Sequence, residues 1–210
     1  MKEQVTPNDL PVGPSTAAPH QVTTWFLAYQ GPTQAMPQWP AHVMLMEAEL
    51  PSPELSHFLF TAVGTPWHWF SRLSWDYQQW LDFLTQQQLR TFVLYVKGTP
   101  AGYIELWCHP EEDHSVELKF FGLMPTFAGQ GLGKLLAQAA VALAQQWQPA
   151  KKVWVHTCSE DHPAALTTYQ KAGFVIEFSE VEQEDVPENY AELALCAPYV
   201  HSRLARFARS

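Results

Sequence analysis

The sequence lacks the features that mark secreted, membrane-spanning or disulfide-stabilised proteins. Its three cysteines, Cys108, Cys158 and Cys196, are widely spaced and include no CxxC pair. A disulfide framework or a zinc ribbon is therefore not expected, and a reducing cytoplasm fits. No apolar run approaches the length of a membrane span, and the first residues, MKEQVTPNDLP, include no apolar segment of the kind found in signal peptides. The sequence thus predicts a cytoplasmic protein that makes no use of a membrane.

Basic residues are also scarce. Twelve lysines and arginines stand against 21 aspartates and glutamates, which gives a formal net charge of −9. A general nucleic-acid binder normally carries a basic surplus, so nucleic acid is not expected as a partner. An acidic surface mildly attracts cationic substrates, and it repels an anionic cofactor unless local positive potential holds that cofactor in place.

The composition and the periodicity predict one domain of the α/β (α+β) class. Apolar residues make up 47% of the 210 residues and charged residues 16%, and no repeat or convincing linker divides the chain. We expect the domain over residues 21–197, between a proline-rich tail (1–20) and a C-terminal tail (198–210). Strands are predicted at 23–30, 42–50, 90–109 (a hairpin), 114–125, 151–157, 174–181 and 191–196. Helices are predicted at 52–63, 74–87, 130–147 and 162–174.

Three glycines in five residues stand at the start of the helix expected at 130–147. They are Gly129, Gly131 and Gly133, and Lys134 follows them in the first helical turn. A helix N-terminus presents unpaired N–H groups and partial positive charge, and glycine lets a bulky anion approach the backbone. This pattern favours a phosphate or pyrophosphate site, with a tight turn that binds no ligand as the alternative. The strand–turn–helix–strand order also predicts a parallel strand pair.

Neither common nucleotide-binding motif fits this turn. The phosphate-binding pattern GxxxxGK[ST] is absent because Leu135 follows Lys134, and GxGxxG is absent because Leu136 stands where its last glycine belongs.

Two segments together resemble the GNAT superfamily of N-acetyltransferases. "VELKFFGLMPTFAGQGLGKLL" is similar to the family's acetyl-CoA-binding motif, in which a strand is followed by [Arg/Gln]-x-x-Gly-x-[Gly/Ala] and a helix. "HPAALTTYQKAGF" is similar to the second family motif, with Ala165, Tyr169, Gly173 and Phe174 in matching positions. Ala128 stands where Arg or Gln is usual, and His162 stands where Asn usually contacts the pantetheine arm. An imidazole can still donate one hydrogen bond there.

The resemblance implies a mixed, mostly antiparallel sheet with helices on both faces. Its central parallel strands, 114–124 and 151–157, would splay apart, and the pantetheine arm of acetyl-CoA, the acyl-donor cosubstrate, would bind in the gap. The expected cofactor-binding residues are Phe121, Leu123, Met124, Gly129, Gln130, Gly131, Leu132, Gly133, Lys134 and His162.

The resemblance also implies catalytic roles for Glu117 and Tyr169. Glu117 would be the general base, directly or through water, and Tyr169 the general acid beside the thioester sulfur. The Leu123 N–H would hold the oxyanion. Strict alternation in the strand places Glu117, Lys119, Phe121 and Leu123 on one face. The alternatives are a glutamate salt-bridged to Lys119 and a tyrosine that belongs to the core.

Trp67 and Trp69 are the expected acceptor-binding residues, because early loops commonly build the acceptor site in this family and loop residues are free to contact ligands. Packing against the sheet is the alternative for both. Cys108, His109 and His114 match no common zinc spacing, so no metal is expected. The sequence thus predicts an acetyl-CoA-dependent N-acetyltransferase that acts in a ternary complex on a small-molecule, amino-acid or peptide amine, as a monomer or homodimer. A non-catalytic acyl-CoA-binding module and a nucleotide-dependent transferase are the competing hypotheses.

Overall fold

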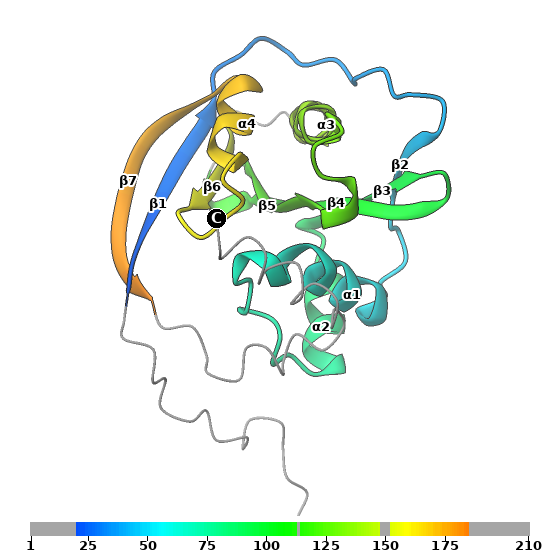
Figure 1. Ribbon diagram of the computed structural model, residues 1–210. Coiled ribbons are helices and arrows are strands. Elements are labelled where there is room, and N and C mark those ends of the chain that lie inside the picture. The colour runs from blue at the N-terminus through cyan, green and yellow to red at the C-terminus, as the bar shows by residue number, and fades with distance from the viewer. Residues whose placement is uncertain (1–19, 113, 148–151, 185–210) are drawn as a thin grey trace, which may run out of the picture.

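One mixed sheet of seven strands organises the part of the chain that the computed structural model describes, residues 20–112, 114–147 and 152–184 (Figure 1). The spatial order is β2-β3-β4-β5-β6-β1-β7. The strands are β1 (His20–Tyr29), β2 (Val43–Glu47), β3 (Leu89–Val96), β4 (Thr99–His109), β5 (Ser115–Leu123), β6 (Val153–Cys158) and β7 (Phe174–Glu184). Every neighbouring pair is antiparallel except β5 and β6. This mixed sheet confirms the expected fold class.

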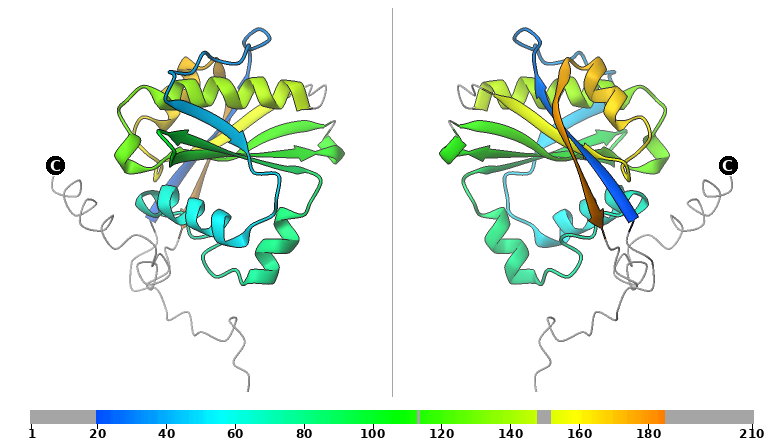
Figure 2. Two further views of the ribbon diagram at one scale, coloured as in Figure 1. Left: turned by 90° about the vertical axis from the view of Figure 1, so that its right-hand side faces the viewer. Right: turned by 90° about the vertical axis from the view of Figure 1, so that its left-hand side faces the viewer.

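Helices cover both faces of the sheet. The helices α3 (Leu132–Trp147) and α4 (Ala165–Lys171) lie on one face, and α1 (Pro53–Gly64) and α2 (Tyr77–Leu84) on the other (Figures 1 and 2). Local signals fix where α1 and α2 begin: the Ser52 hydroxyl accepts from the Leu55 amide, and Asp76 forms a capping box with Gln79. None of the described helices has both the length and the apolar character that a membrane span requires.

The predicted hairpin is confirmed as β3 and β4. Lys97 and Gly98 connect the two strands, and both have positive φ values, 51° and 80°. Two such residues make the tight turn whose twist matches the twist of the strands. The strand expected at 191–196 and both predicted tails lie outside the described residues, except for His20, which was expected in the N-terminal tail and instead begins β1.

The N-terminal strand β1 does not pair with the next strand in the sequence. It lies between β6 and β7 and is antiparallel to both, with Phe26 opposite His156 on one side and Phe178 on the other. The sheet therefore continues from β6 to β7 only through a segment from the other end of the chain.

The parallel pair of β5 and β6 separates soon after it starts. Within the described chain the two strands pair at Val116–Val153 and at Glu117–Trp154, although β5 continues to Leu123 and β6 to Cys158. This confirms the expected splay. Over their second halves the two strands leave backbone groups facing a gap.

A β-bulge in β5 corrects the strict alternation expected for this strand. Glu105 of β4 lies opposite Phe120, and the next residue, Leu106, lies opposite Leu118, so Lys119 is an extra residue. Glu117 pairs with Trp107, whose ring stacks on Phe83 of α2. Phe121 and Leu123 instead pack into the core beneath α3. The expectation that Glu117, Phe121 and Leu123 share a face is therefore wrong, because one inserted residue reverses the side-chain direction.

Candidate active site

The glycine turn leaves an open backbone surface at the start of α3. Gly129 and Gly131 both have φ of 76°, and a Cβ added to either would meet nothing within 4 Å. The left-handed conformation alone requires glycine at these two positions. The open space beside them fits a ligand that approaches the main chain, because α3 directs its first amides there.

The other expected residues of this turn take distinct positions. Lys134 and Gln130 are exposed, and the Gln130 side chain donates to the Thr126 carbonyl at 3.0 Å. Leu132 is buried in the core, so it can offer a ligand only its backbone. A Cβ on Gly133 would lie 3.8 Å from Leu123, which places the turn beside the end of β5.

Backbone groups of β5 point into the gap between β5 and β6. The Met124 amide donates to the Ala101 carbonyl of β4 at 2.8 Å, and the Gly122 carbonyl is directed at Gly102 of β4. Because successive residues of a strand direct their backbone groups to opposite sides, Phe121 and Leu123 direct theirs away from β4 and toward the gap. This is the orientation that an amide-bearing ligand in the gap requires. The Met124 amide is already used, so Met124 could contribute its carbonyl or side chain but not its N–H.

His162 lies in the loop just before the short helix α4, on the other side of the gap. Its Nδ1 accepts a hydrogen bond from the Ala164 amide at 3.0 Å, and the Trp67 ring lies edge-on at 4.8 Å. A neutral imidazole that accepts at Nδ1 carries its proton at Nε2. His162 therefore has one donor to offer a ligand, as an asparagine side chain would.

Asp161, which sequence reasoning missed, joins the end of β6 to the loop after α1. Its Oδ2 accepts from the Thr157 hydroxyl at 2.7 Å and from the Cys158 amide at 3.0 Å. Its Oδ1 accepts from Nε1 of Trp69 at 3.2 Å. These bonds fix the loop at the mouth of the gap.

Trp67 and Trp69 lie on one connection between α1 and α2. Trp69 packs its ring 4.9 Å from Phe120 and 5.8 Å from Phe60, so it also serves the packing role that was its alternative. Between the two tryptophans, Nδ1 of His68 lies 2.6 Å from a carboxylate oxygen of Glu160. Three consecutive residues of this loop thus contact three consecutive residues of the β6–α4 loop, 160–162.

A buried ion pair holds the rest of this connection against the sheet. Arg72 donates from one nitrogen to both oxygens of Glu105 at 2.9 and 2.8 Å. The guanidinium lies over the rings of Phe83 at 4.0 Å and Phe120 at 4.4 Å. Burial raises the pKa of Glu105, and the Arg72 charge opposes that rise. No local sequence pattern predicts this ion pair, because the two residues lie 33 positions apart.

Glu117 lies among three basic side chains on the face that α1 and α2 cover. Its Oε2 is 3.1 Å from Nε2 of His109 and 3.3 Å from Nζ of Lys119, and its Oε1 is 3.2 Å from Nδ1 of His156. The salt bridge to Lys119 that was the alternative for this residue is therefore present. Burial alone would raise the pKa of Glu117, but the contacts with His156, Lys119 and His109 outweigh burial and lower the pKa to about 2.

Tyr169 belongs to the core beneath α3 and α4 and also borders the gap. Its ring centroid lies 5.5 Å from that of Phe121 and 5.9 Å from that of Phe174. Burial raises the pKa of its hydroxyl, and the charge of Asp161 raises it further. The hydroxyl therefore keeps its proton at neutral pH and can act as a donor.

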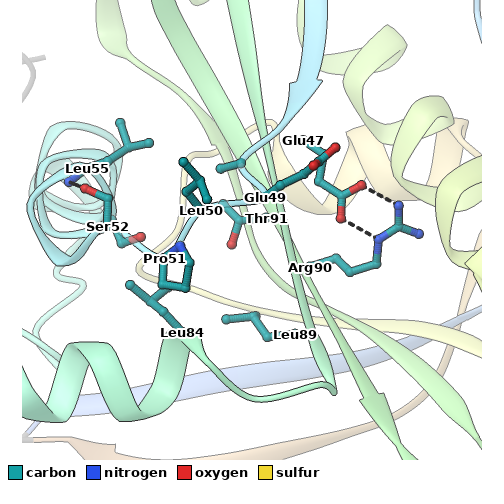
Figure 3. Close-up of a pocket in the computed structure, with 12 residues that line it drawn as sticks. Glu47, Glu49, Leu50, Pro51, Ser52, Leu55, Leu84, Leu89, Arg90 and Thr91 are labelled. Carbon is teal, nitrogen blue, oxygen red and sulfur yellow. Dashed lines mark hydrogen bonds and ion pairs between the residues drawn. The ribbon is translucent and has the colours of Figure 1, made fainter.

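Two hollows of the described surface differ in their relation to the candidate site. One, of about 90 Å³, is lined by the β2–α1 connection, the end of α2 and β3, where Arg90 pairs with Glu47; it shares no residue with the glycine turn, the gap or Glu117 (Figure 3). The other, of about 210 Å³, is lined by Phe26, Leu27, Glu112, Lys152, Trp154, Glu177 and Phe178. Trp154 and Phe26 have ring contacts to His156, at centroid distances of 6.3 and 5.9 Å, so this second hollow lies beside His156, although neither His156 nor Glu117 lines it.

Among the described residues, one group brings three possible metal ligands within 4.8 Å of one another: His109, Glu111 and Glu112. The two glutamates are exposed, and His109 also contacts Glu117. We assign no metal to this acidic surface.

The fold and the two motifs agree with what a family comparison finds. The family described as the acetyltransferase (GNAT) family matches residues 49–174, more than half of the chain. The chain belongs to the GNAT acetyltransferase family. No curated protein matches it in sequence. The matched range leaves out β1 and β2 and all but the first residue of β7.

Solved structures with this fold are distant in sequence. The GCN5-related N-acetyltransferase of Sphaerobacter thermophilus has a TM-score of 0.59 and 15% identity, over 81% of this chain and 53% of that chain. The GCN5-related N-acetyltransferase of Kribbella flavida has a TM-score of 0.54 and 17% identity, over 81% and 60%. An aminoglycoside acetyltransferase from an uncultured soil metagenomic sample, in complex with sisomicin, has a TM-score of 0.53 and 13% identity, over 62% and 87%. This chain thus spans only 53% and 60% of the first two relatives.

Proposed function

We propose that this acetyltransferase moves the acetyl group of acetyl-CoA to a primary amine of a small molecule, an amino acid or a peptide, by direct attack in a ternary complex. The observation that carries the proposal is the gap between β5 and β6. The open glycine turn lies at one end of it, and Glu117 lies where the two strands begin to separate. We further propose that the protein acts in the cytoplasm, as a monomer or homodimer.

The residues around the gap fit acetyl-CoA. Gly129 and Gly131 leave room for a diphosphate where a Cβ would stand, and the amides of Leu132 and Gly133 with the Lys134 charge would attract it. The backbone groups of Phe121 and Leu123 and the Nε2 donor of His162 would bind the amides of the pantetheine arm. When bound, acetyl-CoA supplies an acetyl group activated as a thioester.

The chain's own groups then have three tasks. The Leu123 N–H stabilises the negative charge that develops on the carbonyl oxygen. The Tyr169 hydroxyl donates a proton to the departing thiolate, and burial keeps that proton in place until then. The carboxylate of Glu117 provides the negative charge that favours removal of the ammonium proton. Trp67 and Trp69 would line the path of the acceptor.

The charged and aromatic side chains on the face beside Glu117 narrow the range of candidate acceptors. The 210 Å³ hollow combines the rings of Phe26, Trp154 and Phe178 with the carboxylates of Glu112 and Glu177. Lys152 also lines this hollow, and its Nζ lies 2.7 Å from a carboxylate oxygen of Glu177, so Glu112 supplies the remaining negative charge. Aromatic walls beside that carboxylate suit an amine that carries a second positive charge. The metagenomic aminoglycoside acetyltransferase holds sisomicin, so aminoglycosides belong in the first set of acceptors tested.

Two measurements test the proposal. Acetyl-CoA should raise the melting temperature, and NAD and ATP should not; thiol release should then appear with at least one member of an amine panel. Stabilisation by acetyl-CoA with no thiol release would favour the alternative, a non-catalytic acyl-CoA-binding module. That alternative stays open because Ala128, which is exposed, offers the diphosphate no side-chain donor. Stabilisation by NAD or ATP alone would contradict the cofactor assignment.

Tyr169→Phe tests the acid role. Because the substitution removes only the donor hydroxyl, kcat should fall about tenfold or more while the KM for acetyl-CoA stays near its wild-type value. An unchanged kcat would show that Tyr169 is only a core residue.

A further inference from the structure

On the Glu117 face, a substrate can reach the imidazole of His156 more readily than the carboxylate of Glu117 itself. The Glu117 side chain is 3% exposed and already in contact with three basic groups, whereas the side chain of His156, which touches it, is 43% exposed. A general base must come within hydrogen-bond reach of the proton that it removes, and its proton affinity should match the operating pH. A buried carboxylate that Lys119 and two histidines stabilise in its ionised form meets neither condition well.

His156 lies at the edge of the gap. It is two residues beyond Trp154, the last residue of β6 that pairs with β5, and its ring is on the same face as Glu117 and His109. Its Nδ1 faces Oε1 of Glu117 at 3.2 Å. A carboxylate at Nδ1 favours the tautomer with the proton on Nδ1, which leaves a lone pair on Nε2. No described residue forms a hydrogen bond with Nε2.

We propose that Nε2 of His156 accepts the proton of the acceptor amine, and that Glu117 is the positioning residue that orients the imidazole and stabilises its protonated form. The assignment rests on the proposed acetyl transfer and names the base for it. The 210 Å³ hollow supports it, because two of its walls, Phe26 and Trp154, contact the His156 ring.

The proton balance agrees with this division of roles. An ammonium acceptor loses two protons when it becomes an amide: its nitrogen forms a bond to the thioester carbon, and the carbon–sulfur bond breaks. One of the two protons is matched by the proton that the thiolate receives through Tyr169. The other passes to His156 and from there to solvent, which the half-exposed ring contacts directly.

Among the described residues, the charged group that contacts His156 is Glu117, and the other titratable groups nearby contact Glu117 in turn. Glu117 and Lys119 belong to β5, and His109 belongs to β4; the β1 side contributes the uncharged ring of Phe26. Lys119 and His109 both contact Oε2 of Glu117, so they leave Oε1 to His156. Protonation of His156 would remove the lone pair on Nε2, so the rate should decline on the acidic side.

His156→Asn tests the assignment, because its amide nitrogen can replace Nδ1 toward Glu117 but nothing replaces Nε2. We expect kcat/KM for the amine to fall about 100-fold near neutral pH, with an unchanged KM for acetyl-CoA and loss of the acidic limb of the pH profile. His109→Gln is the matched control. It keeps the contact made by Nε2 of His109, and it should change kcat/KM by a few fold at most and leave the acidic limb in place.

A measurement that needs no turnover tests the role of His156 independently of the proposed acetyl transfer. Long-range ¹H–¹⁵N spectra of the wild type should show His156 protonated at Nδ1 and bare at Nε2, and Glu117→Gln should weaken that preference. The opposite tautomer, or an active His156→Asn variant with its acidic limb intact, would overturn the role of His156 and leave acetyl transfer standing. Binding of acetyl-CoA with no thiol release by the wild type would overturn both.

Discussion

Glu105 and Glu117 are two buried, ion-paired glutamates on the same face of the sheet, and they differ in what surrounds them. Glu105 meets one guanidinium, that of Arg72, inside a wall of aromatic rings, and burial raises its pKa. Glu117 meets three basic groups, and its pKa is lowered to about 2. The first pair has no exposed member; the second includes His156, which is 43% exposed. The difference separates a pair that holds the loop after α1 from a pair that can pass a proton to solvent.

The largest expected effect is on stability and comes from breaking the buried ion pair between Arg72 and Glu105. Arg72→Met removes the only charge that Glu105 contacts directly among the described residues, so a carboxyl is left buried without its partner. The free energy of unfolding should fall by about 3–5 kcal/mol. Chemical denaturation measures the loss.

The double variant Arg72→Met with Glu105→Gln should recover part of that loss, because no charge then remains buried. A loss in Arg72→Met below about 1 kcal/mol, the size of an exposed pair, would contradict the view that this pair anchors the loop.

The ion pair between Glu117 and His156, which has an exposed member, should affect catalysis. Glu117→Gln keeps the shape of the side chain and removes the charge that orients and stabilises His156. Thiol-release kinetics should show kcat reduced by about 100-fold with an unchanged KM for acetyl-CoA. If the KM for acetyl-CoA rose while kcat held, Glu117 would belong to the binding surface and the contrast with Glu105 would fail.

The same pair should also carry a pH-dependent part of the stability. The pKa of Glu117 is lower in the folded protein than its ordinary value of 4.5, so its contribution is present above pH 4.5 and is lost as the pH falls toward 2. The wild type should be more stable than Glu117→Gln by about 3 kcal/mol at pH 7, and that difference should shrink between pH 4.5 and 2.

Denaturation of both proteins across that range checks the result. A difference that stays constant down to pH 2 would mean that the three basic neighbours do not stabilise the charge of Glu117.

The smallest of these effects concerns the cofactor end of the gap. Gly131→Ala adds a Cβ where the structure leaves open space and places alanine at a φ of 76°. The KM for acetyl-CoA should rise about tenfold, since the added methyl group occupies the approach to the first amides of α3.

Gly98→Ala, in the β3–β4 turn, is the matched control for backbone strain. Its φ is 80° and its surroundings are equally open. Equal KM values in the two variants would show that the glycine turn binds nothing.

The two ends of the candidate site differed in how far the sequence could predict them. The glycine turn is local: Gly129 to Lys134 are consecutive, and the helix that follows them carries its own periodicity. The splay came from the family resemblance, and the sheet confirms it. The cofactor contacts of individual residues stay predictions.

Around Glu117 the sequence was less informative, because the contacts are long-range. The bulge at Lys119 depends on the pairing of β5 with β4 and reverses the face that simple alternation assigns. Asp161 reaches Trp69, and His156 reaches Glu117, across 92 and 39 positions. The place of β1 between β6 and β7 is also beyond local pattern, since a strand's periodicity says which face is buried and not which neighbours it has.

Amide hydrogen exchange with and without acetyl-CoA tests the central claim most directly, because it reports where the main chain meets the ligand. The account predicts new protection at the amides of Phe121 and Leu123 and over residues 129–134, with little change at the hollow between β2, α1 and α2. Binding of acetyl-CoA that leaves Phe121 and Leu123 unprotected, or that protects Glu47–Leu55 instead, would contradict it.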